Sequence, residues 1–304
     1  MAAPRVALVV KRSTWRLFVE EKKDPLYKRL LARSDPTITT LRKSHLEHET
    51  TVREVKTALA ELGARVTAFR TRERFDATSF DLVVTVGGDG TMLSASHNVA
   101  HAPILAVNSA PNYSVGFFCG AKSGEVKSAI SRALKGTLRR AQLARMQVLI
   151  NGEVVAGRVL NDALFCHASP AATTRYLIQL GRVVEEQKSS GFWIGPAAGS
   201  TAAQRSAGGR VLALGSRDLQ LVVREPYTPQ GEHYSLRRAL IAPGRKLTIR
   251  CKSYEARLFL DGPDREARVR RGDVVEFLLA GEPLTVLGIG GRRRWGPAAR
   301  IEDV

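Results

Sequence analysis

Cysteine is scarce in this chain of 304 residues, which contains only Cys119, Cys166 and Cys251. An odd number of widely separated cysteines without a Cys-x-x-Cys pair indicates neither a disulfide framework nor a zinc site. Long apolar runs are missing as well: the run from Val6 to Val10 ends at Lys11-Arg12 and is too short for a signal sequence or a membrane span. We therefore expect a cytoplasmic protein with no membrane partner.

Acidic residues are outnumbered, with 29 Asp and Glu against 47 Lys and Arg, so the net charge is +18. Such a charge attracts polyanions by long-range electrostatics. Aromatic residues make up only 6% of the chain, and no basic stretch interleaved with aromatic residues suggests a groove for single strands. We expect no nucleic-acid partner and interpret most of this charge as solvated surface.

Two common nucleotide-binding fingerprints are also absent. The sequence has no P-loop of the form GxxxxGK[ST] and no GxGxxG turn between a strand and a helix. The second absence argues against a dehydrogenase that only holds NAD.

The first part of the chain alternates between strand and helix patterns. Short runs rich in valine predict buried strands over 5–10, 64–69, 82–86 and 103–107. Helical spacing predicts helices over 25–33, 44–62, 91–100 and 126–134. Because Ser44 and Glu47 have capping-box spacing, the second helix is expected to begin there. This alternation predicts a parallel, Rossmann-like α/β sheet over residues 1–140, with ligands at the carboxyl ends of its strands.

Short strands replace this pattern beyond about residue 137. Asn151-Gly152 predicts a type I′ turn that joins strands over 143–150 and 153–165. Further strand candidates cover 176–180, 219–223, 247–251, 257–260, 274–279 and 284–289. We therefore expect an antiparallel, all-β sandwich domain over residues 141–285.

The most informative segment is Gly87-Gly88-Asp89-Gly90-Thr91, which directly follows the strand at 82–86. Its glycines let backbone N–H groups approach a bulky anion such as a phosphate, because no Cβ intervenes. Asp89 is then the only reactive group in the turn. A plain strand-to-helix connection is the structural alternative.

Two further segments differ from ordinary scaffold. Asn161-Asp162 closes an apolar strand and is either a ligand-binding pair or a turn. Residues 189–209 are rich in small residues that could lie against a flat polar ligand, and Phe192-Trp193-Ile194 argues against a flexible linker there. His97 and His101 lie four residues apart, but no third metal ligand follows, so a structural or solvated role is expected.

Taken in order, GGDGT, the Asn-acid pair and GSTAAQRSAGG resemble the three signature segments of the NAD kinase family. GGDGT alone is shared with diacylglycerol and sphingosine kinases, whereas the GSTA…SAGG segment is far more specific. The resemblance covers about Val83 to Gly262, and Asp261-Gly262 resembles a further family turn. It is closest to the divergent branch of plant NADH kinases and animal mitochondrial NAD kinases.

The resemblance implies transfer of the ATP γ-phosphoryl to the adenosine ribose 2′-hydroxyl of NAD or NADH, with Mg²⁺ carried by ATP and no metal site on the protein. Small nucleotides would be the partners, the protein would be a homodimer or larger, and a tail over 286–304 would pack back on the first domain. Asp89 would orient and deprotonate the hydroxyl. Gly88, Gly90 and Thr91 would hold phosphates. The dinucleotide would be bound by Asn161, Asp162, Thr201, Ala202, Ser206, Phe117 and Ser190.

The chain also departs from the family pattern. Ser190 stands where most members have Asp, and Ala203 stands where they have Tyr. Both changes leave the choice between NAD and NADH open. Two alternatives remain: a lipid kinase of the diacylglycerol or sphingosine type, and a dinucleotide-sensing module that has lost catalysis.

Overall fold

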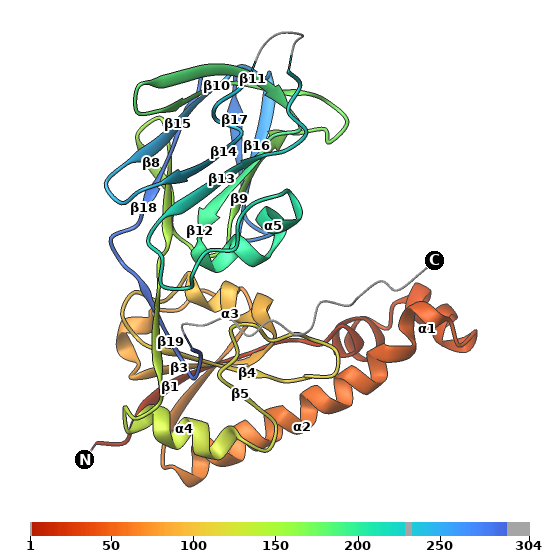
Figure 1. Cartoon of the computed structure of the whole chain (residues 1–304). Coiled ribbons are helices and arrows are strands. Elements are labelled where there is room, and N and C mark those ends of the chain that lie inside the picture. The colour runs from red at the N-terminus through yellow and green to blue at the C-terminus, as the bar shows by residue number, and fades with distance from the viewer. Residues whose placement is uncertain (1, 229–232, 291–304) are drawn as a thin grey trace, which may run out of the picture.

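Three β-sheets build the protein in a computed structural model that describes residues 2–228 and 233–290. A mostly parallel sheet with its helices lies at one end of the molecule, and two antiparallel sheets form the other end (Figure 1). This arrangement confirms the expected order of an α/β part followed by an antiparallel β part.

The parallel sheet has the strand order β2-β1-β3-β4-β19-β6, with β5 beside β4. Its strands are β1 Arg5–Val10, β2 Arg65–Arg70, β3 Leu82–Gly87, β4 Ile104–Asn108, β5 Ala121–Lys122, β6 Arg140–Leu143 and β19 Leu284–Leu287. Only the pairing of β19 with β6 is antiparallel among these described strands. The carboxyl ends of β1, β2, β3 and β4 therefore meet at one edge of the sheet.

Helices cover both faces of this sheet. The α-helices of the described chain are α1 Pro25–Ala32, α2 Thr39–Glu61, α3 Asp89–Ser96, α4 Val126–Leu134 and α5 Ala203–Ser206. A π-helix and three 3₁₀ helices add η1 Trp15–Glu21, η2 Pro36–Ile38, η3 Ala77–Ser79 and η4 Ala197–Thr201. Val6 and Leu8 of β1 pack with α2 and α4, whereas Ala7 and Val9 pack on the side of α3. Burial on both faces explains the uninterrupted apolar runs of these strands.

The predicted start of α2 at Ser44 is wrong, because the helix begins at Thr39. Asp35 initiates the preceding 3₁₀ turn by accepting a hydrogen bond from the Thr37 N–H, and α2 continues directly from that turn. Ser44 therefore lies inside the helix, and its capping-box spacing has no capping role.

The two antiparallel sheets enclose a second core that contains Phe165, Phe192 and Phe277. One sheet contains β11 Val183–Ser189, β10 Thr174–Leu180, β15 Lys246–Cys251, β18 Val274–Leu279, β7 Met146–Ile150 and β8 Glu153–Val159. The other contains β14 Arg238–Ile241, β13 Leu219–Val223, β12 Phe192–Pro196, β9 Ala163–His167, β16 Glu255–Leu260 and β17 Glu266–Arg270.

The predicted hairpin turn at Asn151-Gly152 is present, with the positive φ values of 52° and 85° that a type I′ turn requires. The second strand is shorter than predicted, since β8 ends at Val159 and β9 begins at Ala163 in the other sheet. The interruption between β8 and β9 contains Asn161 and Asp162.

Two segments cross between the parallel sheet and the antiparallel sheets. Ala144 and Arg145 join β6 to β7, and residues 280–283 join β18 to β19. The Ala280 N–H donates to the Arg145 carbonyl at 2.8 Å, so the two crossings lie side by side. Of the expected tail, Val286 and Leu287 belong to β19 in the parallel sheet, and residues 291–304 lie outside the described residues.

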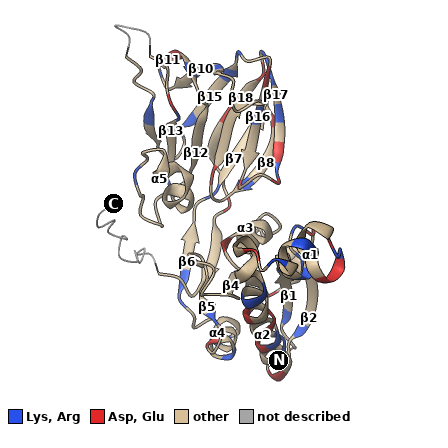
Figure 2. Ribbon diagram, turned by 90° about the vertical axis from the view of Figure 1, so that its right-hand side faces the viewer, with Lys and Arg blue, Asp and Glu red and all other residues tan. Residues whose placement is uncertain are grey.

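Lys and Arg are spread over both halves of the described chain rather than gathered in one stripe (Figure 2). Among the described residues, no helix is long and apolar enough to span a membrane.

Candidate active site

The glycine turn lies at the carboxyl end of β3, where α3 begins. Gly88 is the N-cap of this helix and Asp89 is its first residue. A Cβ on Gly87 would overlap the Thr91 side chain, and a Cβ on Gly88 would lie 2.5 Å from Oγ of Ser114. A Cβ on Gly90 would have nothing within 4 Å. The turn therefore presents the N-terminal backbone of α3 to open space, an arrangement that suits a phosphate.

The Asp89 carboxylate is held by backbone N–H groups of the loop after β4. Its Oδ2 accepts from Phe117 N at 2.9 Å, and its Oδ1 accepts from Phe118 N at 2.8 Å. Asn108, the last residue of β4, supports this loop by donating to the Ser114 carbonyl at 2.9 Å. Because each carboxylate oxygen can accept more than one hydrogen bond, Asp89 keeps acceptor capacity for a ligand.

A second cluster surrounds Asp261, which has a positive φ of 53°. Its carboxylate accepts from the N–H groups of Leu160, Asn161 and Asp162 at 2.8, 2.6 and 3.1 Å. Asp261 Oδ2 also lies 3.0 Å from Nε2 of His97, the C-cap of α3, although the contact is not a directed hydrogen bond. The same short helix thus begins at Asp89 and ends against the group that fixes the Asn161-Asp162 backbone.

Asp162 is buried beside Asp261. Burial, together with the negative charge of Asp261, raises the pKa of Asp162 to about 7. The carboxyl group of Asp162 therefore titrates near neutral pH. Such a raised pKa is unusual for an aspartate and is typical of functional sites.

The small-residue segment packs directly against this pair. A Cβ on either Gly195 or Gly199 would overlap the Asn161 carbonyl, so both positions require glycine. Ser200 is fully buried: it donates to the Ala197 carbonyl at 2.8 Å and accepts from Leu212 N at 2.9 Å, which gives it a structural role. Of the predicted ligand residues in this segment, Thr201 ends η4, Ala202 lies between η4 and α5, and Ser206 ends α5.

Ser190 lies apart from the other predicted residues. It sits between β11 and β12, and its N–H donates to the Arg224 carbonyl at 3.1 Å. Strand β12 runs from Phe192 to Pro196 before η4 begins at Ala197, so Ser190 is about 20–23 Å from η4 along an extended strand. Within one chain, the structure does not bring Ser190 to the glycine turn.

A cavity of about 860 Å³ opens over the glycine turn. Its walls include Asp89, His97 and Asp261, so the cluster around Asp89 and the cluster around Asp261 face the same cavity. The cavity is also lined by cations that come from several segments, namely Lys11, Arg12, Arg72, Arg74 and Arg265. Leu17 of η1 contributes an aliphatic wall, and Asp264 forms a 2.5 Å ion pair with Arg72. The volume and charge suit a nucleotide with several phosphates.

These cations were not among the predicted site residues. The signal that could have revealed them is positional: Lys11 and Arg12 directly follow β1, and Arg72 and Arg74 lie in the loop that follows β2. The residues that follow parallel strands begin at the same edge of the sheet, so basic residues that follow neighbouring strands lie close together there. Arg265 had no such signal, because it reaches the cavity from the turn between β16 and β17.

The described residues contain no group of three or more His, Cys, Asp or Glu that could hold a metal ion by itself. Mg²⁺ that is held mainly by phosphates and water needs only one or two protein carboxylates, and the cavity provides Asp89. These residues fit a cation that arrives with a nucleotide.

Comparisons with known proteins agree with this geometry. The family model described as ATP-NAD kinase N-terminal domain matches residues 6–138. A probable NADH kinase of Oryza sativa subsp. japonica is 32% identical over 219 residues, covering 65% of this chain and 67% of the relative. An NADH kinase of Arabidopsis thaliana is 34% identical over 224 residues, covering 65% of this chain and 69% of the relative.

The chain belongs to the NAD kinase family. Its fold is also that of an NAD kinase from Archaeoglobus fulgidus solved in complex with ATP, with a TM-score of 0.66, 18% identity and 93% coverage of both chains. Membership of the NAD kinase family does not favour the lipid-kinase alternative, because the similarity extends well beyond the GGDGT turn.

Proposed function

We propose that the protein transfers the γ-phosphoryl group of ATP to the 2′-hydroxyl of the adenosine ribose of NAD or NADH. The observation that carries this proposal is the Asp89 carboxylate, which two backbone N–H groups hold on the wall of a basic cavity. Membership of the NAD kinase family supports the identity of both substrates.

Asp89 acts as the base for the acceptor hydroxyl. Phosphoryl transfer depends mainly on positioning and on neutralising charge, so a single well-placed carboxylate is sufficient. The hydrogen bonds from Phe117 N and Phe118 N fix the orientation of both Asp89 oxygens. An Asp89 carboxylate oxygen accepts the proton of the 2′-hydroxyl. The ribose 2′-oxygen forms a bond to the γ-phosphorus at the same time, and the bond from that phosphorus to ADP breaks.

The donor phosphates bind over Gly88, Gly90 and Thr91. Backbone N–H groups at the start of α3 and the surrounding cations supply the positive potential that the transferred group requires. A Mg²⁺ ion that arrives with the nucleotide would supply further neutralisation of phosphate charge at this place. Asp89 is the carboxylate of this chain that would share that cation.

The acceptor dinucleotide binds on the side of the antiparallel sheets. Asn161, Asp162, Thr201, Ala202 and Ser206 are the proposed contacts, and Phe117 lies against a ring of the substrate. The packing of Gly195 and Gly199 on the Asn161 carbonyl supports a common role for these segments. Ser190 lies at the far end of β12 from these residues, and we propose that a second copy of the chain in a homodimer brings its Ser190 to the dinucleotide.

The three unpaired cysteines support the cytoplasm as the proposed compartment.

A pair of aspartate variants tests this function. Asp89→Asn removes the proposed base, and Asp264→Asn makes the same chemical change elsewhere on the cavity wall, at a carboxylate that is paired with Arg72. We expect Asp89→Asn to lower kcat by about 10²–10⁴-fold and Asp264→Asn to leave kcat within a few-fold of the wild type. Equal loss in both variants, or an active Asp89→Asn protein, would contradict the role of Asp89.

The sensing alternative predicts another outcome. A protein that has lost catalysis would bind NAD or NADH in calorimetry and form no phosphorylated product at saturating Mg·ATP.

A further inference from the structure

Arg145 is a buried cation at the junction of the two halves, and the proposed chemistry gives it no role. It lies in the first crossing segment and its side chain is 0% exposed. Burial and the neighbouring charge of Arg158 lower the pKa of Arg145 to about 10, so the guanidinium remains charged at neutral pH. A buried charge is costly unless its hydrogen-bonding groups are satisfied, so the partners of Arg145 indicate what it does.

Those partners come from two places that are distant in the sequence. Its guanidinium donates to carbonyls that follow or end α3, at 3.3 Å for Ser96, 2.7 Å for Val99 and 3.4 Å for Ala100. It also donates to carbonyls of the second crossing, at 2.8 Å for Glu282 and 3.4 Å for Pro283. A single side chain therefore joins the end of α3 to both crossing segments.

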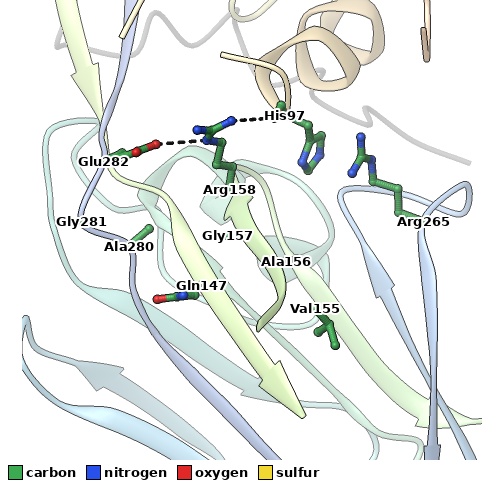
Figure 3. Close-up of a pocket in the computed structure, with 10 residues that line it drawn as sticks. All are labelled: His97, Gln147, Val155, Ala156, Gly157, Arg158, Arg265, Ala280, Gly281 and Glu282. Carbon is green, nitrogen blue, oxygen red and sulfur yellow. Dashed lines mark hydrogen bonds and ion pairs between the residues drawn. The ribbon is translucent and has the colours of Figure 1, made fainter. Parts of the chain in front are cut away.

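The contact suits the electrostatics of a helix terminus. The last carbonyls of a helix have no partner within the helix and carry partial negative charge, which a cation stabilises. Arg158 of β8 adds a second cation by donating to the His97 carbonyl at 3.2 Å, and Glu282 pairs with Arg158 at 3.1 Å (Figure 3). Glu282 also lies 3.6 Å from Arg145, so one carboxylate balances both arginines.

We propose that Arg145 is a positioning residue for phosphoryl transfer, which sets the place of Asp89 relative to the acceptor site by fixing α3 to both crossing segments. The helix is short and begins at Asp89, so a shift at its end moves the carboxylate at its start. The crossings carry the antiparallel half that holds Asn161 and Asp162. This inference rests on the proposed kinase function, because it concerns the alignment of the two substrates.

Arg145→Lys is the variant that separates positioning from charge. Lysine keeps the positive charge but replaces the planar fork with one ammonium group of three donors, which cannot reach both sets of carbonyls. We expect kcat to fall at least tenfold, while the dissociation constants of Mg·ATP and of NAD, each measured alone by calorimetry, change less than threefold. Hydrogen exchange should become faster in α3 and in residues 280–284.

Two controls make this result specific. Arg158→Lys changes the matched arginine, which is partly exposed and has a single bond to the helix end, and it should retain kcat within threefold. Val275→Ala removes core volume between the antiparallel sheets and reports loss of stability alone; at a temperature where it is folded it should retain kcat. If Arg145→Lys is insoluble, Glu282→Gln serves instead, with kcat expected to fall two- to fivefold at unchanged substrate affinity.

Several results would overturn the inference. These are an Arg145→Lys protein with kcat within twofold of the wild type, loss of binding of both substrates in that variant, an equal loss of kcat in Val275→Ala, or an unchanged kcat in the Glu282→Gln substitute. An inactive wild-type protein would instead contradict the proposed kinase function, so the two failures are distinguishable.

Discussion

Two aspartates of the site show how surroundings give one residue type two behaviours. Two backbone N–H groups hold the Asp89 carboxylate in a fixed orientation on the cavity wall. Asp162 is buried beside Asp261, and the pKa of its carboxyl is raised to about 7. The difference arises from hydrogen bonds and burial, which a sequence motif does not reveal.

The raised pKa of Asp162 makes stability depend on pH. Between its ordinary pKa of 3.8 and about 7, the folded protein keeps a proton that the unfolded chain releases, so the free energy of unfolding falls as pH rises. The amide side chain of the Asp162→Asn variant cannot ionise, so the free energy of unfolding of this variant does not fall with pH for this reason. We expect the stability of the variant relative to the wild type to increase by about 2–3 kcal/mol from pH 5 to pH 8.

Thermal or urea unfolding of both proteins at several pH values measures this difference, because titrating groups common to both proteins cancel. Parallel pH profiles for the wild type and Asp162→Asn would contradict the raised pKa.

At the scale of elements, α3 connects the chemistry with the architecture. It begins in the glycine turn, and its end contacts Asp261 through His97 and the crossings through Arg145. Its length of eight residues gives little internal stability. Packing at both ends therefore determines where Asp89 lies.

Two glycines of the turn predict different outcomes when replaced by alanine. A Cβ at Gly88 would crowd Ser114, so Gly88→Ala should lower both the melting temperature and the activity. A Cβ at Gly90 meets no protein atom, and alanine favours helix by about 0.5–1 kcal/mol. Gly90→Ala should therefore keep or raise the melting temperature, yet raise the KM for ATP at least tenfold because its methyl group occupies the proposed phosphate site. Calorimetric melting and ATP titrations distinguish the two variants, and an unchanged KM in Gly90→Ala would place the phosphates elsewhere.

Elements with a strong local pattern were predictable from the sequence. Strand β1 has the predicted bounds, and β3 and α4 differ from prediction by no more than a residue at either end, because apolar periodicity and terminal glycines mark them. Strands β11 and β12 were not predicted, since their sequences are mixed or belong to the small-residue segment. Among site residues, the GGDGT turn was visible as a local motif. His97, Arg145 and the cavity arginines were not, because their roles depend on contacts across the fold.

Across the molecule, the net charge of +18 is distributed so that part of it lies at the candidate active site. Most cations are spread over the surface (Figure 2), but five of them line the cavity with Asp89. These cations outnumber the carboxylates on the same wall, which are Asp89, Asp261 and Asp264, so the cavity attracts an anionic substrate.

Salt dependence tests this interpretation of the charge. The double variant Arg72→Gln/Arg74→Gln removes two cavity cations, whereas Arg182→Gln/Arg268→Gln removes two exposed cations outside the cavity and changes the net charge equally. We expect the first pair to raise the KM for ATP at least fivefold and to flatten its dependence on ionic strength, because screening acts on the charges that face the ligand. The second pair should behave as the wild type, and identical salt profiles in the two double variants would contradict a local effect.

The most direct test of the whole account is the reaction of the wild-type protein with Mg·ATP and either NAD or NADH, followed by phosphorus NMR. The proposed function predicts one ADP for each new phosphomonoester, with that phosphate on the 2′-oxygen of the adenosine ribose. Absence of a phosphorylated dinucleotide with both NAD and NADH, or phosphate on any other oxygen, would contradict it.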